Sequence, residues 1–214
     1  MEDSKITHLR KEYSLNGLSE QDVLANPIDQ FKKWFDEALT AEIIEPNALF
    51  LSTISNEGFP QGRIVLLKEV DANGFVFYTN YHSHKAADLA AHPLAALTFW
   101  WAELERQVRI CGKVEKVSEA ESDAYFAIRP RESQLGAWTS DQSEVIESRN
   151  VLSQKSEMLK IKFADQPIPR PAHWGGYRVI PHQIEFWQGR PSRLHDRIFY
   201  ECKNNEWQIE RLSP

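Results

Sequence analysis

Cysteine is scarce in this chain of 214 residues, with Cys111 and Cys202 as its only two. Two cysteines cannot build a disulfide framework, and no CxxC pair or cysteine–histidine cluster has the spacing of a zinc site. We therefore expect two free thiols, no bound metal and a reducing, cytoplasmic location.

Basic charge and long apolar runs are also lacking. The chain has 25 Lys and Arg against 31 Asp and Glu, a net charge of −6. A groove that follows a nucleic-acid backbone usually needs a basic excess, so this balance argues against nucleic acid as a partner. No run approaches the ~20 apolar residues that span a bilayer. The polar start MEDSKITHLRKEY gives no signal peptide, so we expect no membrane partner.

Glycine-rich phosphate loops are absent, because neither GxGxxG nor GxxxxGK[ST] occurs. The hydrolase and protease patterns GxSxG and HExxH are missing too. Any phosphate must therefore be bound by side chains, and the positions of arginine and lysine become the main guide to function.

The pattern of apolar residues predicts a mainly β protein. Residues 1–25 are polar and aperiodic and are expected to form a flexible arm before a single domain at 26–214. Asn26 and Pro27 begin an amphipathic helix that should reach about residue 44. The remaining expected helices are 82–93, 118–128 with a capping box from Ser118 and Glu121, and 141–163. The expected strands are 48–54, 62–70, 75–80, 94–101, 104–117, 177–188 and a final hairpin at 197–212 that turns at 203–205.

Residues 129–138 are expected to be a loop. Because strands and helices do not alternate regularly, this order argues against a doubly wound sheet. It favours an antiparallel barrel with peripheral helices.

The strand RIVLLK has a cation at each end, Arg63 and Lys68. On a regular strand these two side chains point to opposite faces. They can serve one site only if a bulge, a strand end or a second ligand intervenes. The alternative is two exposed charges at the ends of a strand.

Residues 78–85, YTNYHSHK, join a strand to a helix. Hydroxyl groups, free helical N–H groups and Lys85 would together bind an anion. The alternative is an ordinary junction at which Ser83 caps the helix.

Two further positions could contact a ligand. Gln107 lies inside a strand, where burial without partners would cost ~1–3 kcal/mol, and a heteroaromatic ring edge would satisfy it. Tyr125, Arg129 and Ser133 are spaced four apart, and a phenol, a guanidinium and a hydroxyl would suit a phosphate. The alternatives are a glutamine facing solvent and a solvated helix end.

The stretch EFWQGRPSRLHDR at 185–197 is more specific, and with it the chain resembles the pyridoxine (pyridoxamine) 5′-phosphate oxidase family. The diagnostic pattern is E-F-W-Q, four variable residues, then R-L-H-D-R. RIVLLK, FYTN, ERQVRI, RPRESQLGAW and WGGYRV occur in the order that this family shows. The resemblance extends from LRKEY at Leu9 to the terminal RLSP.

The resemblance implies a homodimeric FMN-binding split β-barrel, with FMN at the subunit interface. It implies oxidation of pyridoxamine or pyridoxine 5′-phosphate to pyridoxal 5′-phosphate, with O2 reduced to H2O2. It assigns catalytic roles to Arg193 and His195. The implied FMN contacts are Arg63, Ile64, Val65, Leu66, Leu67, Lys68, Tyr78, Thr79, His84, Lys85, Gln107, Gln142, Ser143, Trp187 and Arg197. The implied substrate contacts are Arg10, Lys11, Glu12, Tyr13, Lys68, Tyr125, Arg129, Ser133, Arg193, Leu194 and His195.

Charge balance agrees with these assignments. Two phosphate monoesters bring roughly −3 to −4 of charge, which Arg63 and Lys85 on the flavin side and Lys68 and Arg129 on the substrate side would offset. The planar guanidinium of Arg193 would stack on the pyridine ring.

One position departs from the family pattern, because His84 replaces the usual arginine. Histidine side chains titrate near pH ~6.5, so its help to a phosphate should fade above neutrality. Two rival functions are a split-barrel flavoprotein of another specificity and a non-catalytic carrier of flavin or pyridoxal phosphate.

Overall fold

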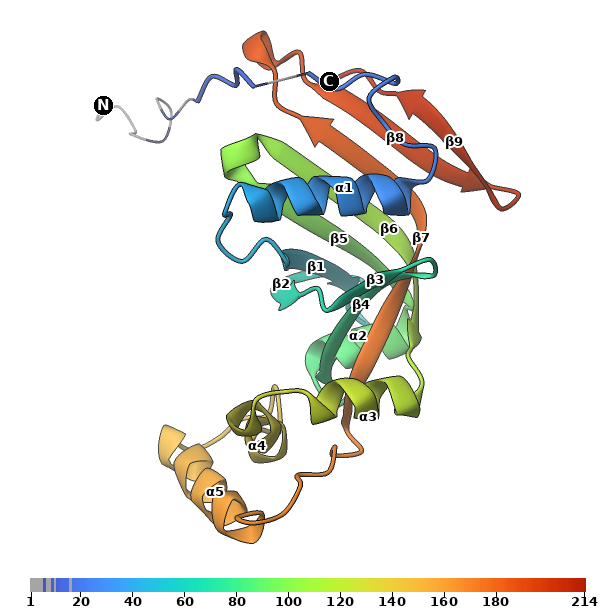
Figure 1. The fold of residues 1–214 in the computed structure, drawn as a ribbon. Helices are drawn as coiled ribbons and strands as arrows, with labels where there is room; N and C mark the ends of the chain where they lie inside the picture. The colour runs from blue at the N-terminus through green and yellow to red at the C-terminus, as the bar shows by residue number, and fades with distance from the viewer. Residues whose placement is uncertain (1–5, 7–8, 10, 16) are drawn as a thin grey trace. The chain divides into compact units, whose positions relative to one another are not determined.

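The computed structural model describes residues 6, 9, 11–15 and 17–214, and it is mainly β with five α-helices in that part of the chain (Figure 1). None of the described helices is long and apolar enough to cross a membrane. The elements are α1 (Pro27–Thr40), β1 (Ala48–Ile54), β2 (Pro60–Leu66), β3 (Glu69–Asp71), β4 (Gly74–Asn80), α2 (His84–Ala91), β5 (Leu94–Trp101), η2 (Ala102–Leu104), β6 (Arg106–Lys116), α3 (Glu119–Ala127), α4 (Arg131–Thr139), α5 (Arg149–Lys162), β7 (Trp174–Gln188), η3 (Pro191–Arg193), β8 (Asp196–Lys203) and β9 (Glu206–Arg211).

The chain divides into two compact units. The terminal unit contains the chain up to Pro46 together with 98–110 and 182–214, and the central unit contains 47–97 and 111–181. The strands follow the order β2-β1-β5-β6-β7-β4-β3, with β8 paired to β7 and β9 paired to β8. Strands β5, β6 and β7 each contribute one segment to each unit.

In the terminal unit, α1 supplies much of the core. Asn26 caps the helix by accepting a hydrogen bond from the Ile28 amide at 2.8 Å, as the sequence predicts. Phe31 then packs 5.0 Å from Phe99 of β5, centroid to centroid. The helix ends at Thr40, four residues earlier than expected.

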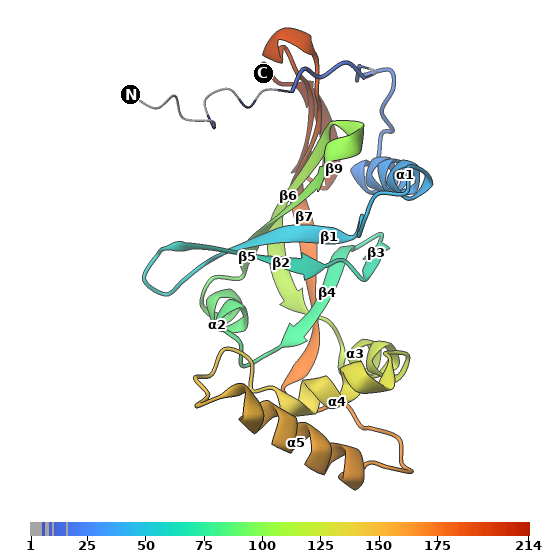
Figure 2. The ribbon, with the colours of Figure 1, turned by 90° about the vertical axis from the view of Figure 1, so that its left-hand side faces the viewer.

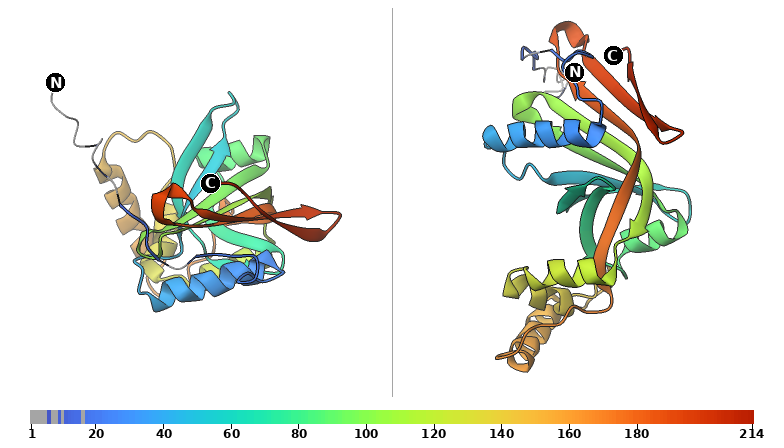
Figure 3. Two further views of the ribbon diagram at one scale, coloured as in Figure 1. Left: turned by 90° about the horizontal axis from the view of Figure 1, so that it is seen from above. Right: turned by 45° about the vertical axis from the view of Figure 1, so that its right-hand side comes forward.

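The terminal unit also contains the β8–β9 hairpin (Figure 3). Lys203 pairs with Glu206, and the turn residues Asn204 and Asn205 adopt left-handed φ angles of 53° and 64°. Asparagine tolerates this region better than most residues, which explains why the predicted turn at 203–205 is correct.

In the central unit, β1 and β2 form an antiparallel pair in which Leu51 lies opposite Arg63 (Figure 2). Strand β2 ends at Leu66, and the Lys68 amide instead donates to the carbonyl of Val76 at 2.8 Å. The predicted strand 62–70 is therefore broken into β2 and β3. Because β2 ends between Arg63 and Lys68, the rule that alternate residues of a strand face opposite sides does not apply across this pair. A strand end is one of the three conditions under which both side chains could serve one site.

Two predictions were wrong for the segment that forms helices α4 and α5. Figure 2 shows these two helices side by side. The expected loop at 129–138 contains α4, which has Pro130 at its N-cap and Leu135 buried. Helix α5 begins at Arg149 rather than near residue 141. By contrast, the capping box of Ser118 and Glu121 at the start of α3 is confirmed.

Candidate functional site

Lys85 lies in the first turn of α2, in the central unit, within a set of neutral oxygen atoms. Its Nζ donates to Thr79 Oγ1 at 3.1 Å, to Ser83 Oγ at 3.1 Å and to Gln142 Oε1 at 3.0 Å. Among the residues that the structure describes, Lys85 forms an ion pair with no carboxylate. The ammonium is therefore held in a polar cradle of neutral oxygens with no direct carboxylate partner, an arrangement that suits the binding of an anion.

Burial lowers the pKa of Lys85 to about 8, repulsion by Arg63 acts in the same direction, and Asp88 opposes both. Arg63 donates to Thr53 Oγ1 at 2.6 Å, and Thr53 donates to Asp88 Oδ2 at 2.6 Å. Arg63 Nη2 also lies 3.5 Å from Asp88 Oδ2. Two cations thus share this region with one buried carboxylate, which leaves a net positive charge.

The start of α2 differs in detail from the prediction. Ser83 occupies the N-cap position, but its hydroxyl donates to the carbonyl of Asn80 at 2.8 Å and caps no helical amide. The His84 amide donates to Ser143 Oγ at 3.3 Å, and the His84 side chain is exposed. The structure therefore brings the predicted residues 79, 84, 85, 142 and 143 together around one helix start.

A stack of three aromatic rings from separate elements forms a second feature of the central unit. The rings of Tyr78 and Tyr125 lie 4.0 Å apart at 18°, and Tyr78 lies 5.4 Å from Trp174 at 10°. The guanidinium of Arg129 covers the Trp174 ring at 4.4 Å. Burial raises the pKa of Tyr78 to about 12, so the phenol stays protonated near neutrality.

Arg129 is the second uncompensated cation. Its Nη1 atom is buried and has no hydrogen-bond partner among the described residues. Burial also lowers the pKa of Arg129 from its usual range. An unpaired guanidinium nitrogen is costly, so it marks a place for an anion. Ser133, the third predicted member of this group, lies in the first turn of α4.

The residues of the RIVLLK stretch differ in how far they are exposed to solvent. Arg63, Val65 and Leu66 are half-buried, Leu67 is buried, and Ile64 and Lys68 are exposed. Of this stretch, Arg63 is the residue whose side chain reaches α2, through Thr53 and Asp88.

In the terminal unit, a pocket of about 820 Å³ is lined by five of the eleven predicted substrate residues. Its walls include Lys11, Glu12, Tyr13, Trp187, Arg193 and His195. Leu194 is exposed and is not part of these walls, and Arg10 lies outside the described residues.

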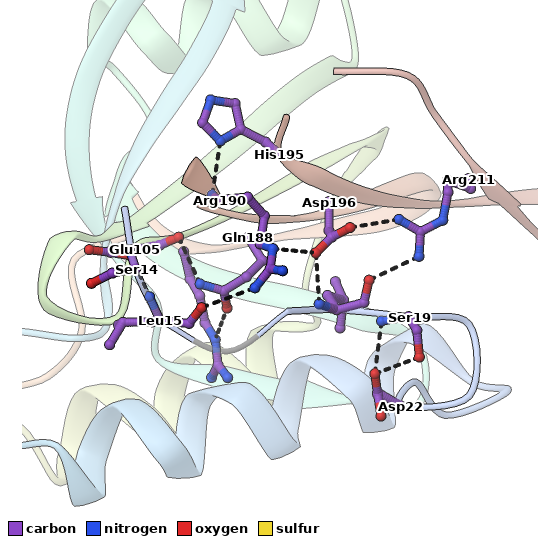
Figure 4. A network of polar contacts seen from close by, with 12 residues as sticks. Ser14, Leu15, Ser19, Asp22, Glu105, Gln188, Arg190, His195, Asp196 and Arg211 are labelled. Atoms are coloured by element: carbon purple, nitrogen blue, oxygen red, sulfur yellow. Dashed lines mark hydrogen bonds and ion pairs between the residues drawn. The ribbon is translucent and has the colours of Figure 1, made fainter. Parts of the chain in front are cut away.

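His195 is fixed by ring contacts and by one backbone hydrogen bond. Its ring lies 4.5 Å from that of Trp187, and its Nδ1 accepts a hydrogen bond from the Arg190 amide at 3.1 Å (Figure 4). The neutral ring therefore carries its proton on Nε2. Burial lowers the pKa of His195, the charge of Arg193 adds to this, and Asp196 opposes it. His195 is thus a neutral hydrogen-bond donor at physiological pH.

Two predicted flavin residues of the terminal unit have different surroundings. Arg197 lies opposite Trp187 in the β7–β8 pair and binds the Glu185 carboxylate at 2.8 and 3.1 Å. This pairing raises the pKa of Arg197. Gln107 is half-buried in β6, and its side-chain amide has no hydrogen-bond partner among the described residues.

Sequence reasoning missed several residues that shape these sites. Trp174, which covers Arg129, opens the WGGYRV motif and was detectable from its place there. Thr53 and Asp88 are 35 residues apart, and no local pattern links them. Glu185, the partner of Arg197, begins the EFWQ motif, although its pairing depends on the strand register.

Two family profiles match the chain. One, described as pyridoxamine 5′-phosphate oxidase, matches residues 35–162, and one, described as pyridoxine 5′-phosphate oxidase C-terminal dimerisation region, matches residues 174–214. The chain is 61% identical to the pyridoxine/pyridoxamine 5′-phosphate oxidase of Nostoc punctiforme over 99% of its length and all of that protein. It is 56% identical to the enzyme of the same name from Cupriavidus necator, with the same coverage.

Solved structures give a similar result. PhzG from Burkholderia lata, in complex with tetrahydrophenazine-1-carboxylic acid, matches with a TM-score of 0.89 and 29% identity, covering 95% of this chain and all of that one. A pyridoxamine 5′-phosphate oxidase-related, FMN binding protein from Nostoc punctiforme matches with a TM-score of 0.70 and 17% identity, covering 86% and 97% of the two chains. The second likeness concerns the fold alone. The predicted split β-barrel is confirmed.

Proposed function

The chain belongs to the pyridoxamine 5′-phosphate oxidase family, and from this we propose that it oxidises pyridoxamine or pyridoxine 5′-phosphate to pyridoxal 5′-phosphate, with FMN as cofactor and O2 as electron acceptor. The observation that carries the proposal is the presence of two separate cationic groups that form no ion pair with any described residue, Lys85 in its cradle and Arg129 above Trp174. Two such groups suit a reaction in which both cofactor and substrate carry a phosphate.

The residues around Lys85 fit the phosphate of FMN. An ammonium that donates only to neutral oxygens gains a stronger, charge-assisted partner when a phosphate arrives. Arg63, oriented by Thr53, adds a second charge. When bound, FMN supplies the hydride acceptor that O2 reoxidises, with H2O2 as product. The proposed cofactor residues are Arg63, Ile64, Val65, Leu66, Leu67, Lys68, Tyr78, Thr79, His84, Lys85, Gln107, Gln142, Ser143, Trp187 and Arg197.

The residues around Arg129 fit the phosphate of the substrate. The unpaired Nη1 would donate to a phosphate oxygen, and the Tyr125 phenol is a second donor. Ser133 and Lys68 complete the proposed phosphate contacts. The substrate's charge would thereby replace the hydration that Arg129 gave up on folding.

Arg193 and His195 are proposed to orient the substrate ring. The guanidinium of Arg193 can stack on a pyridine face, and the Nε2–H of neutral His195 can donate a hydrogen bond. Lys11, Glu12, Tyr13 and Leu194, with Arg10, complete the proposed substrate set. We assign no general base, since no residue in the pocket has the geometry that identifies one.

The C-terminal match supports a homodimer, because residues 174–214 match a region described as a dimerisation region. We propose that FMN binds at the interface of the two subunits and that the enzyme acts in the cytoplasm.

A second candidate follows from the likeness to PhzG, whose solved complex holds a tricyclic carboxylic acid. An oxidase for such a ligand would share a flavin site, and its ligand would bring a carboxylate in place of the substrate phosphate. The unpaired Arg129 nitrogen suits either anion, and the 61% identity to a pyridoxine/pyridoxamine 5′-phosphate oxidase favours the phosphorylated substrate.

The proposal is tested with purified protein. We expect flavin absorption near ~450 nm, which is a property of the cofactor. Addition of pyridoxamine 5′-phosphate without oxygen should bleach this absorption, and aeration should restore it with release of H2O2. Unphosphorylated pyridoxamine is the matched control and should bleach it far more slowly. A protein that stays inert after FMN is supplied would refute the proposal, and equal rates with both amines would favour the second candidate.

A further inference from the structure

Residues 11–15, 17 and 18, called here the N-terminal strap, are held by carboxylates that come from distant parts of the terminal unit (Figure 4). The amides of Ser14 and Leu15 donate to Glu105 Oε2 at 3.0 and 3.2 Å. The amide of Leu18 donates to Asp196 Oδ2 at 3.0 Å. Backbone amides that bind a carboxylate fix the path of the chain itself, independently of which side chains it carries.

Glu105 has an unusual environment for a carboxylate. The residue is only 3% exposed, and it adopts a left-handed φ of 53° at the corner between η2 and β6. Its side chain binds the two strap amides and lies 3.6 Å from Lys11 Nζ. All polar partners of the Glu105 carboxylate among the described residues therefore belong to the strap. A buried charge without partners is costly, so strap and carboxylate depend on each other.

The backbone of Glu105 is fixed from the opposite side. Its carbonyl accepts hydrogen bonds from the Gly189 amide at 2.8 Å and from Gln188 Nε2 at 3.3 Å. These two residues follow Trp187 in the chain, so the corner and the end of β7 form one assembly. The carboxylate is thus presented from a rigid base, as a positioning group requires.

The strap forms one wall of the pocket that is also lined by Trp187, Arg193 and His195. The ring of Tyr13 meets the rings of Trp187 and His195 edge-on, each at 5.7 Å. The fit is close, because a Cβ at Gly189 would lie 2.7 Å from Tyr13 Cγ. Where the strap runs therefore decides where Tyr13 meets the pocket.

We propose that Glu105 is a positioning residue for the substrate, whose carboxylate holds the strap so that Tyr13 lies against Trp187 and His195. This inference rests on the proposed function of the pocket. A charged acceptor binds amides more strongly than a neutral one, so the closed strap depends on the charge of Glu105. Asp196 also binds the strap, but it pairs with Arg211 and lies 3.5 Å from Arg190, so its removal would disturb more than the strap.

The test compares Glu105→Gln and Glu105→Ala with the control Glu103→Gln, which removes the same charge from an exposed position at the same corner. Hydrogen exchange of the Ser14 and Leu15 amides is measured in the FMN-loaded, full-length proteins. We expect exchange to be about tenfold faster in Glu105→Gln, the effect of weakening one charge-assisted bond, and faster still in Glu105→Ala. The control should match the native protein.

Steady-state kinetics supply the second measurement. A strap that only positions the bound substrate should act equally on the ground state and the transition state. KM for pyridoxamine 5′-phosphate should therefore rise about tenfold in Glu105→Gln with kcat and FMN affinity unchanged. Unaltered amide exchange in Glu105→Ala, or a kcat loss without a change in KM, would overturn the inference. A third outcome separates the two proposals. If amide exchange becomes faster in the variants but the native protein oxidises no phosphorylated pyridine, Glu105 holds the strap but the proposed function is wrong. The role of Glu105 in positioning that substrate is then wrong as well.

Discussion

Lys85 and Asp88 lie three residues apart on α2, so an ammonium and a carboxylate occupy neighbouring positions on one helix face. They do not pair with each other. Lys85 binds hydroxyl and amide oxygens, and Asp88 accepts from Thr53 and lies beside Arg63. Because the carboxylate is occupied elsewhere, Lys85 is available for an external anion. The affinity for that anion should therefore depend on whether Lys85 is protonated.

The affinity for FMN should fall as pH rises through the pKa of Lys85. Burial holds this pKa at about 8 in the absence of ligand, so the ammonium is present below that pH and is lost above it. Each further pH unit should then weaken binding by up to about tenfold. Fluorescence titrations with FMN from pH 7 to 9.5 measure this, and Lys85→Arg should give a flatter profile. Equal profiles would contradict the assignment.

Replacing Asp88 with asparagine should move this titration. Because the carboxylate raises the pKa of Lys85 against the effect of burial, its removal lowers that pKa. FMN affinity should therefore begin to fall at a lower pH in Asp88→Asn. The matched variant Thr53→Val breaks the hydroxyl bridge to Arg63 but keeps the charge, so its profile should keep the native midpoint. An unshifted midpoint in Asp88→Asn would argue against electrostatic coupling between the two residues.

Arginine at position 84 should reduce the dependence of FMN affinity on pH between 6 and 8. Histidines lose their charge in this range, whereas arginine keeps it. His84 lies at the first position of α2, next to Lys85, so both proteins share every other cation of the site. Parallel titrations of the native protein and His84→Arg isolate the contribution of this residue. Identical slopes would show that His84 does not reach the phosphate.

Loss of Arg129 should weaken substrate binding and leave the flavin in place. The guanidinium has an unpaired, buried Nη1 and would contribute at least one charge-assisted bond, commonly worth ~1.5–3 kcal/mol. We expect Arg129→Gln to raise KM for pyridoxamine 5′-phosphate by roughly ten- to hundredfold. The same variant should have little effect on KM for unphosphorylated pyridoxamine. A similar loss with both substrates would place Arg129 away from the phosphate.

Arg178 should contribute more to stability than an exposed ion pair does. Its side chain is 9% exposed and binds Asp71 at 2.8 Å and Glu121 at 2.7 Å. Removing one member of a buried pair can cost 3–5 kcal/mol, but these partners are 31% and 43% exposed, so we expect about 2 kcal/mol for Arg178→Met. Urea unfolding measures this. Lys160→Gln, which breaks an exposed pair, should leave the unfolding midpoint unchanged.

Local patterns predict strands β1 and β5 well because their burial alternates along their whole length, so a period of two was visible in the sequence. Helix α4 lies where a loop was expected at 129–138. Pro130 occupies its N-cap position, which is compatible with a helix because the amides at a helix start have no intrahelical partner.

The candidate sites were predictable where their parts are close in the sequence. Thr79 and Lys85 belong to one strand–helix junction, and their contact follows from it. The bridge from Arg63 through Thr53 to Asp88 joins two strands and a helix, so it required the tertiary structure. The link between Glu105 and Ser14 spans 91 residues and was equally out of reach.

The contacts of the strap also bear on how the protein is made. Leu18 is held by groups 178 and 193 residues further along the chain, on Asp196 and Arg211. A chain emerging from the ribosome presents Leu18 long before these partners exist. Leu18 must therefore wait for the much later segment that carries Asp196 and Arg211, and closing such long loops is slow. A nascent chain arrested before the β8–β9 hairpin would still expose the segment around Leu18 to proteases.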